Sequence, residues 1–231
     1  MPEAKKTRKS RTEKKLEKQL LWIGGFLAAL VLAFIIAGLA IKKSNQFEYE
    51  GLLFTKECLR GDRPDPFLSY KCAGGIRLYH HYFYYKNDLG KLIKYNLYLR
   101  TDPRVNDIGA EGRPISFDTK RVFIALDTTY LDDCPDSQIA IGGLSLFLAD
   151  NQLAVRSGNT DFTEAAVRKQ KYVTCEKNAN DSVIEIKRAN STGITINGKC
   201  MKIDVGQKCD ILNATERFKV DAIIDAQLKK R

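Results

Sequence analysis

The residues best suited to chemistry lie in one acidic stretch, residues 127–137, directly after an apolar run. Asp127, Asp132 and Asp136 supply carboxylates, and α/β sheets bind ligands in the crevice beyond the carboxyl ends of their strands. Carboxylate oxygens gathered there could hold a divalent cation. Cys134 precedes an expected helix start, where a thiol can have a lowered pKa. These four residues are the candidates for catalysis.

Each of these residues also suits a purely structural role, which we favour. Asp136 can cap a helix, Asp132 can be a solvated loop charge, and Cys134 can form a disulfide. The chain has no G-x-S-x-G, P-loop, H-E-x-x-H or dinucleotide motif. Its two histidines, His80 and His81, are adjacent and would point to opposite faces of a strand. We therefore expect no metal and no cofactor, and keep an acidic-loop hydrolase or metal-dependent enzyme as the alternative.

An uncharged apolar segment at residues 20–41 is long enough to cross a membrane. Its 22 residues at about 1.5 Å per residue span a hydrocarbon core of roughly 30 Å. A cleaved signal peptide is the rival interpretation, because Gly38 and Ala40 are small residues before a possible cleavage site. The segment is much longer than a signal-peptide core of roughly 7–15 residues, so we predict a retained anchor.

The charge around this segment predicts the orientation. Residues 1–19 hold eight Lys or Arg and three Glu, which is +5 of the formal net charge of +10. The positive-inside rule keeps this tail in the cytoplasm and exports the rest, with the lipid bilayer as a partner. The tail has no interleaved aromatic residues, so nucleic acid is not an expected partner. A stripe of small residues would allow a homodimer through the helix; its members are Gly25, Ala29, Ala33 and Ala37.

The cysteines and glycosylation sequons agree with export. All six cysteines follow the apolar segment, as expected for disulfides in an oxidising compartment; they are Cys58, Cys72, Cys134, Cys175, Cys200 and Cys209. Six cysteines allow 15 pairings, and proximity along the chain suggests Cys58–Cys72 and Cys200–Cys209, which leaves Cys134–Cys175. The sequence also contains three possible glycosylation sites, at Asn180, Asn190 and Asn213.

The exported part has the pattern of one α/β domain over residues 51–231, after a polar stalk at 42–50. Residues 76–85 and 91–100 flank a turn and predict an antiparallel hairpin with one buried face. Its aromatic run from Tyr79 to Tyr85 is either a ligand platform or cross-strand packing, and we favour packing.

A βαβ unit and a mixed sheet are expected further along the chain. A continuous apolar strand at 121–126, a helix after Ser137 and a strand at 153–157 form the unit. The expected buried positions of that helix are Ile139, Leu144, Phe147 and Leu148. Strands are expected at 172–175, 183–187 and 194–205, the last as a hairpin turning at Asn197-Gly198. A helix over 215–228 ends the chain, with Leu228 beside its buried stripe.

The segments YNLYLRTDPR, CPDSQIAIGGLSLFL, YVTCEKN and FKVDAIIDA, in this order, resemble uncharacterised single-pass membrane proteins of small-genome archaeal lineages. The resemblance implies a short cytoplasmic tail, one span and a cysteine-bearing exported domain. It implies no activity and no site residue. Taken with the patterns above, it favours a non-enzymatic cell-envelope component that binds another envelope protein, a glycan or itself.

Overall fold

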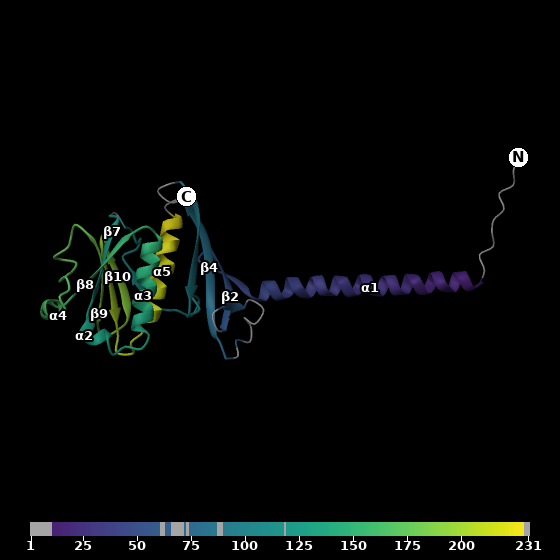
Figure 1. Cartoon of the computed structure of the whole chain (residues 1–231), viewed down its shortest axis with the longest axis horizontal. Helices are drawn as coiled ribbons and strands as arrows, with labels where there is room; N and C mark the ends of the chain where they lie inside the picture. Colours follow the sequence, from purple (N-terminus) through teal and green to yellow (C-terminus); the bar gives the residue numbers. More distant parts are fainter. Residues whose placement is uncertain are drawn as a thin grey trace. The chain divides into compact units, whose positions relative to one another are not determined.

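A computed structural model describes residues 11–60, 63–65, 72, 74–86, 90–117 and 119–228. The chain divides into two compact units, Met1–Phe47 and Glu48–Arg231. Figure 1 shows both units, and each is described by itself below.

The first unit consists of one long helix, α1 (Arg11–Ser44). Within it, Glu17–Ala40 has a mean hydropathy of 2.7 and no buried residues, so its length and composition suffice to cross a membrane. An isolated helix with apolar side chains on all sides would be poorly soluble in water, because nothing removes these side chains from solvent. The small residues at positions 25, 29, 33 and 37 all lie on α1 at four-residue spacing.

An antiparallel sheet, here called sheet A, follows directly. Its strands pair in the order β1-β2-β4-β5, with β3 on the other side of part of β2. The strands are β1 (Gln46–Tyr49), β2 (Leu52–Arg60), β3 (Arg63–Asp65), β4 (Ile76–Lys86) and β5 (Leu92–Leu99). The predicted hairpin is confirmed as β4 and β5. Residues 46–49, which the sequence placed in a stalk, form strand β1 instead.

The second sheet, sheet B, is mixed and has the order β6-β10-β11-β9-β7-β8. Strands β8, β7, β9 and β11 run parallel, whereas β10 is antiparallel to β11. The strands are β6 (Ala110–Glu111), β7 (Arg121–Leu126), β8 (Ala154–Asn159), β9 (Ser182–Arg188), β10 (Gly193–Asn197) and β11 (Cys200–Val205). The α/β class and the mixed sheet are therefore confirmed, as are the strand–helix–strand unit and the hairpin at Asn197-Gly198.

Two helices, α3 (Ser137–Asp150) and α5 (Ile211–Leu228), lie between the two sheets (Figure 1). Helix α5 is buried over most of its length, including its charged residues other than Arg217. Helix α3 and strands β10 and β11 pack against it, and Arg217 donates a hydrogen bond to Tyr49 of sheet A. Two short helices, α2 (Thr128–Leu131) and α4 (Phe162–Val167), complete this unit.

Three details differ from the sequence-based expectation. Residues 172–175 form no strand, apart from an isolated bridge between Asn159 and Tyr172. Ile139, expected in the core, is 45% exposed, because α3 buries Ala140 and Leu144 instead. Leu228 is also exposed, since it belongs to the last turn of α5.

Candidate functional site

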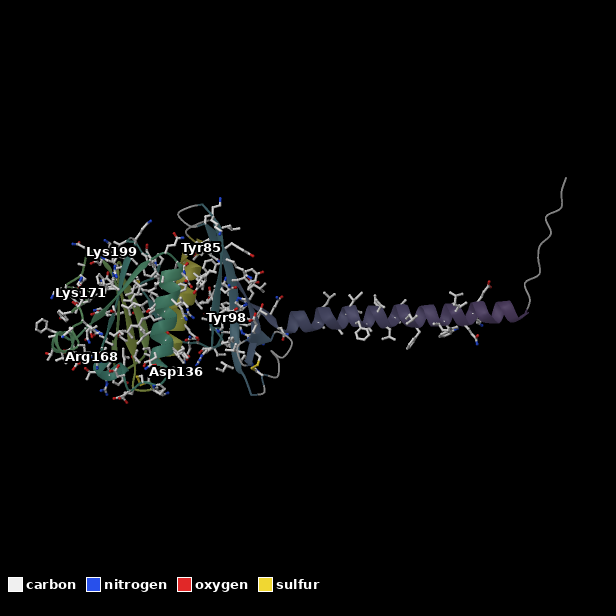
Figure 2. All side chains as sticks on the ribbon, viewed as in Figure 1. Tyr85, Tyr98, Asp136, Arg168, Lys171 and Lys199 are labelled. Carbon is white, nitrogen blue, oxygen red and sulfur yellow. A yellow bond between two sulfur atoms is a disulfide. The ribbon has the colours of Figure 1, made fainter. Side chains whose placement is uncertain are left out.

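The acidic stretch does not form a metal site. Asp127 follows β7 and precedes α2, and its backbone N–H donates to the carbonyl of Ile186. Asp132 pairs with Arg168 at 2.8 Å, and Asp136 lies 3.5 Å from Arg100. Figure 2 labels Asp136 and Arg168.

The three carboxylates do not gather within the 4.8 Å that would let them share a cation. Among the described residues, only Cys175, Glu185 and Cys200 bring three such ligand atoms together, and their cysteines are bonded to each other. Asp136 precedes α3 in a left-handed conformation, and its side chain makes no capping hydrogen bond. Neither a metal centre nor a helix cap therefore explains these residues, and two of them form exposed ion pairs.

All six cysteines form disulfides. The Cys58–Cys72 pairing is confirmed, but the other two predicted pairs are wrong: Cys134 bonds to Cys209 and Cys175 to Cys200. The reason is the direction of the strands. Cys200 begins β11 and Cys209 follows its far end, so the extended strand separates them. Cys134 and Cys209 meet because β7 and β11 have their carboxyl ends at the same edge of sheet B. With Cys134 oxidised, a reactive thiolate is absent from the acidic stretch.

The two histidines lie on opposite faces of β4, as expected. His81 is buried, and its Nδ1 lies 2.9 Å from the carbonyl of Leu53. Burial lowers the pKa of this imidazole. His80 faces the other way, with Nδ1 at 2.7 Å from Glu57 Oε1, and its ring stacks on Tyr98 with centroids 4.4 Å apart. The aromatic run therefore packs across strands, and it also leaves part of its outer side exposed.

The predicted glycosylation residues differ in accessibility. Asn180 and Asn190 are exposed. Asn213 lies on α5, where its side-chain oxygen accepts a hydrogen bond from Thr101 at 2.6 Å, and Thr215 of the same sequon is fully buried. Asn213 is therefore the least accessible of the three predicted glycosylation sites.

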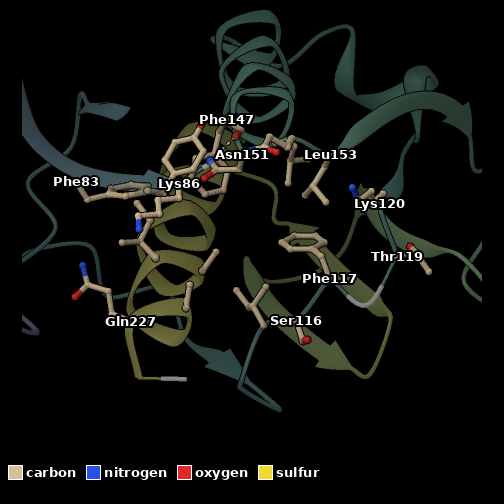
Figure 3. A pocket seen from close by; sticks show the side chains of 17 residues that line it. Phe83, Lys86, Ser116, Phe117, Thr119, Lys120, Phe147, Asn151, Leu153 and Gln227 are labelled. Carbon is tan, nitrogen blue, oxygen red and sulfur yellow. Dashed lines mark hydrogen bonds between the residues drawn. The ribbon is translucent and has the colours of Figure 1, made fainter. Parts of the chain in front are cut away.

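A hollow in this unit lies at the opposite end of sheet B from the acidic stretch. It has a volume of about 550 Å³, within the usual range for small-molecule sites. Its walls come from the end of β4, the segment before β7, the end of α3 and the last turns of α5 (Figure 3). The described lining residues are Phe83, Tyr85, Lys86, Ile115, Ser116, Phe117, Thr119, Lys120, Phe147, Leu148, Asn151, Gln152, Leu153, Ala222, Ile223, Ala226 and Gln227.

The hollow exists because two small residues face a ring of large ones. Ala222 and Ala226 are four residues apart and so lie on the same side of α5. Ile115 is held by a hydrogen bond from its N–H to the buried carboxylate of Asp225, at 2.8 Å.

Buried charges on α5 fix the neighbouring segments. Asp225 also accepts hydrogen bonds from Arg113, the shorter at 2.7 Å. Near the other end of α5, Glu216 accepts the backbone N–H groups of Arg100 and Thr101 at 2.7 and 2.9 Å. Burial raises the pKa of Glu216, partly offset by these hydrogen bonds. Helix α5 thus ties the end of sheet A and the pocket wall to sheet B.

The lining combines an apolar floor with a few polar groups at its rim, which suits binding. Its floor is apolar, since Ile115, Phe147 and Ile223 are each almost fully buried. Among the described lining residues none is Asp, Glu, His or Cys. Lys86 and Lys120 lie on opposite sides of the hollow (Figure 3) and bring positive charge to it. An apolar interior beneath two ammonium groups matches an amphiphile with an anionic head.

Sequence reasoning missed this pocket. The sequence predicted a site beyond the carboxyl ends of the parallel strands, whereas part of the pocket lining precedes β7 and β8, at the amino ends of these strands. The one local signal is the pair Ala222 and Ala226, four residues apart on α5. Comparisons with protein-family models, curated proteins and solved structures found no match.

Proposed function

We propose that this chain is a membrane-anchored, non-enzymatic binding protein that holds an amphiphilic molecule in the 550 Å³ pocket of its extracytoplasmic unit. The observation that carries the proposal is the composition of the pocket: an apolar floor, two lysines, and no Asp, Glu, His or Cys among the described lining residues. The anchor is α1, and the ligand class is a single hydrocarbon chain with an anionic head.

The anchor and its orientation have separate support. Helix α1 contains a 24-residue apolar stretch near the N-terminus, and the basic tail precedes it. Three disulfides in the second unit are typical of an oxidising compartment outside the cytoplasm. Protease added to intact cells is therefore expected to degrade the 48–231 unit. Its survival until the cells are lysed would contradict this orientation.

The energetics favour an anionic amphiphile over a neutral one. Burying each methylene from water contributes about 0.8 kcal/mol, so a chain of about ten gains on the order of 8 kcal/mol. A chain taken from a bilayer gains almost none of this, since it is already in an apolar environment. Selection from a membrane therefore depends on the head, where a hydrogen bond to a charged group contributes about 1.5–3 kcal/mol.

The proposal can be tested by photolabelling the full-length protein in nanodiscs with a diazirine fatty acid. We expect labelled peptides from the pocket walls, around residues 115–117, 147–153 and 222–227. Helix α1 should also be labelled by the lipid-dissolved probe, which makes it an internal control. Labelling of α1 alone would refute ligand binding in the pocket.

A matched pair of variants sharpens this test. Ala226→Trp places a large ring at an exposed lining position and should abolish pocket labelling. Ala149→Trp makes the same change at an exposed position on α3 that does not line the pocket, and should leave labelling intact. Lys86→Glu should weaken labelling by the anionic probe more than labelling by an uncharged alcohol of the same chain length.

A further inference from the structure

One face of sheet A points away from α3 and α5. Side chains alternate between the two faces of a strand. On one face of β4 and β5, Tyr79, His81, Leu97 and Leu99 are buried. The opposite face, here called the outer face, carries the even-numbered residues of β4 and β5 and the odd-numbered residues of β2.

The outer face exposes an unusual number of large side chains for a protein surface. Six of them are between 41 and 59% exposed, namely Leu53, Ile76, Tyr82, Tyr84, Leu92 and Tyr98. Contiguous exposed apolar patches of this kind mark an interaction surface. Tyrosine is enriched where one end of the side chain meets an apolar medium and the other meets water, above all at membrane interfaces.

The charge on the outer face is of one sign along β4 and β5. Lys94 lies there, and neither strand places an acidic residue on this face. Lys94 Nζ lies 4.2 Å from the centre of the Tyr82 ring. On β2, Glu57 shares the face, but its side chain is 13% exposed and paired with His80. The face therefore complements anionic headgroups.

The covalent chain brings sheet A to the bilayer surface. The apolar segment ends at Ile41 and β1 begins at Gln46, so four residues connect them. Four residues span at most about 14 Å even when fully extended. The headgroup layer on each side of the hydrocarbon core is about 5–8 Å thick. Sheet A is thus the first structure that the exported chain forms outside the lipid.

We infer that the outer face of sheet A rests on the lipid headgroups of the membrane that α1 anchors. The three exposed tyrosines insert their rings at the headgroup level, and Lys94 contacts anionic lipid phosphates. The inference uses the anchor of the proposed function but not its pocket.

The experiment is fluorescence quenching in nanodiscs that hold one copy of the full-length chain. The single tryptophan, Trp22, lies in α1 and is replaced by phenylalanine. Tyr84→Trp then places a reporter on the outer face, and Ala149→Trp places one at an exposed site on α3. The discs contain phosphatidylcholine and phosphatidylglycerol in equal amounts, with a nitroxide on the phosphatidylcholine headgroup.

We expect several-fold stronger quenching of the reporter at position 84 than of the one at position 149. Quenching should weaken in discs of phosphatidylcholine alone and in Lys94→Glu. Equal quenching at both positions would overturn the inference. The reporter at position 84 could instead be blue-shifted and unquenched, and only in discs that hold two copies of the chain. That result would assign the outer face to contact with a second copy and would also overturn the inference.

The same preparation separates failure of this inference from failure of the anchor. In the unsubstituted chain, Trp22 must be quenched by lipids that carry the nitroxide on the acyl chain. If Trp22 is quenched but the reporter at position 84 is not, only the outer-face inference fails. If Trp22 is not quenched, the anchor fails and this inference fails with it, whereas pocket binding still has its own labelling test.

Discussion

Removal of the Cys134–Cys209 disulfide should destabilise the 48–231 unit more than removal of either other disulfide. The three bonds close loops with sequence separations of 75, 25 and 14 residues. In the chain-entropy model these loops correspond to about 4.5, 3.5 and 3 kcal/mol at 25 °C. The largest value belongs to Cys134–Cys209 because this bond restricts the longest stretch of the unfolded chain.

The assay compares three double variants in which each bonded pair is replaced by alanines, so that no unpaired thiol remains. Differential scanning calorimetry of the full-length protein in one detergent gives the midpoint of unfolding for each. For a unit of this size, about 3 °C is lost per kcal/mol. We therefore expect midpoints lower by about 13 °C for Cys134/Cys209, 10 °C for Cys175/Cys200 and 9 °C for Cys58/Cys72.

Two results would refute this reasoning. Peptide mapping without reduction could find Cys200 bonded to Cys209, which would mean that the strand directions of sheet B are wrong. Alternatively, the Cys58/Cys72 variant could lose the most stability, in which case loop length does not control the contribution of these bonds.

Three further predictions concern this unit. In Gly112→Ala (φ +78°) the added Cβ would lie 1.9 Å from a backbone carbonyl oxygen of β10. In Gly198→Ala the backbone also has a positive φ, but no atom lies near the added Cβ. Gly112→Ala should therefore lower the unfolding midpoint clearly more than Gly198→Ala. Arg113→Met leaves the buried carboxylate of Asp225 without its ion pair and should cost about 3 kcal/mol in a urea titration; an unchanged midpoint would show that the pair does not hold the pocket wall. His81 has a lowered pKa in the folded protein, so only the unfolded chain takes up its proton near pH 6.5. Its contribution to stability is present above this pH and is lost as the pH falls toward the folded pKa; His81→Phe should flatten that part of the pH–stability curve, and a parallel curve would contradict the assignment.

Local patterns in the sequence predicted most of the elements. The alternation in residues 91–100 predicted β5, the continuous apolar run predicted β7, and Asn197-Gly198 predicted the turn between β10 and β11. These features depend on residues a few positions apart, so they are readable along the chain. The strand predicted at 172–175 does not form, because a local β-rich pattern does not show whether sheet B has a neighbouring strand for it to pair with along its length.

The candidate site depended on contacts that no local pattern contains. The acidic stretch was predicted as a candidate site because its carboxylates are close in sequence. In the structure, Asp132 and Asp136 form ion pairs with two different arginines. The pocket joins Phe83 to Ile223, which are far apart along the chain, and its only sequence trace is a pair of alanines on α5.

By itself, the sequence determined that the chain has a helix suited to a bilayer, an α/β unit after it and cysteines confined to that unit. Hydropathy, residue periodicity and cysteine position are properties of single segments, so they can be evaluated without knowledge of the fold. The tertiary structure alone decided which cysteines pair, which side of sheet A stays exposed and where a hollow remains. These outcomes depend on strand order and on the volume left between packed elements, and such quantities exist only after distant segments have come together.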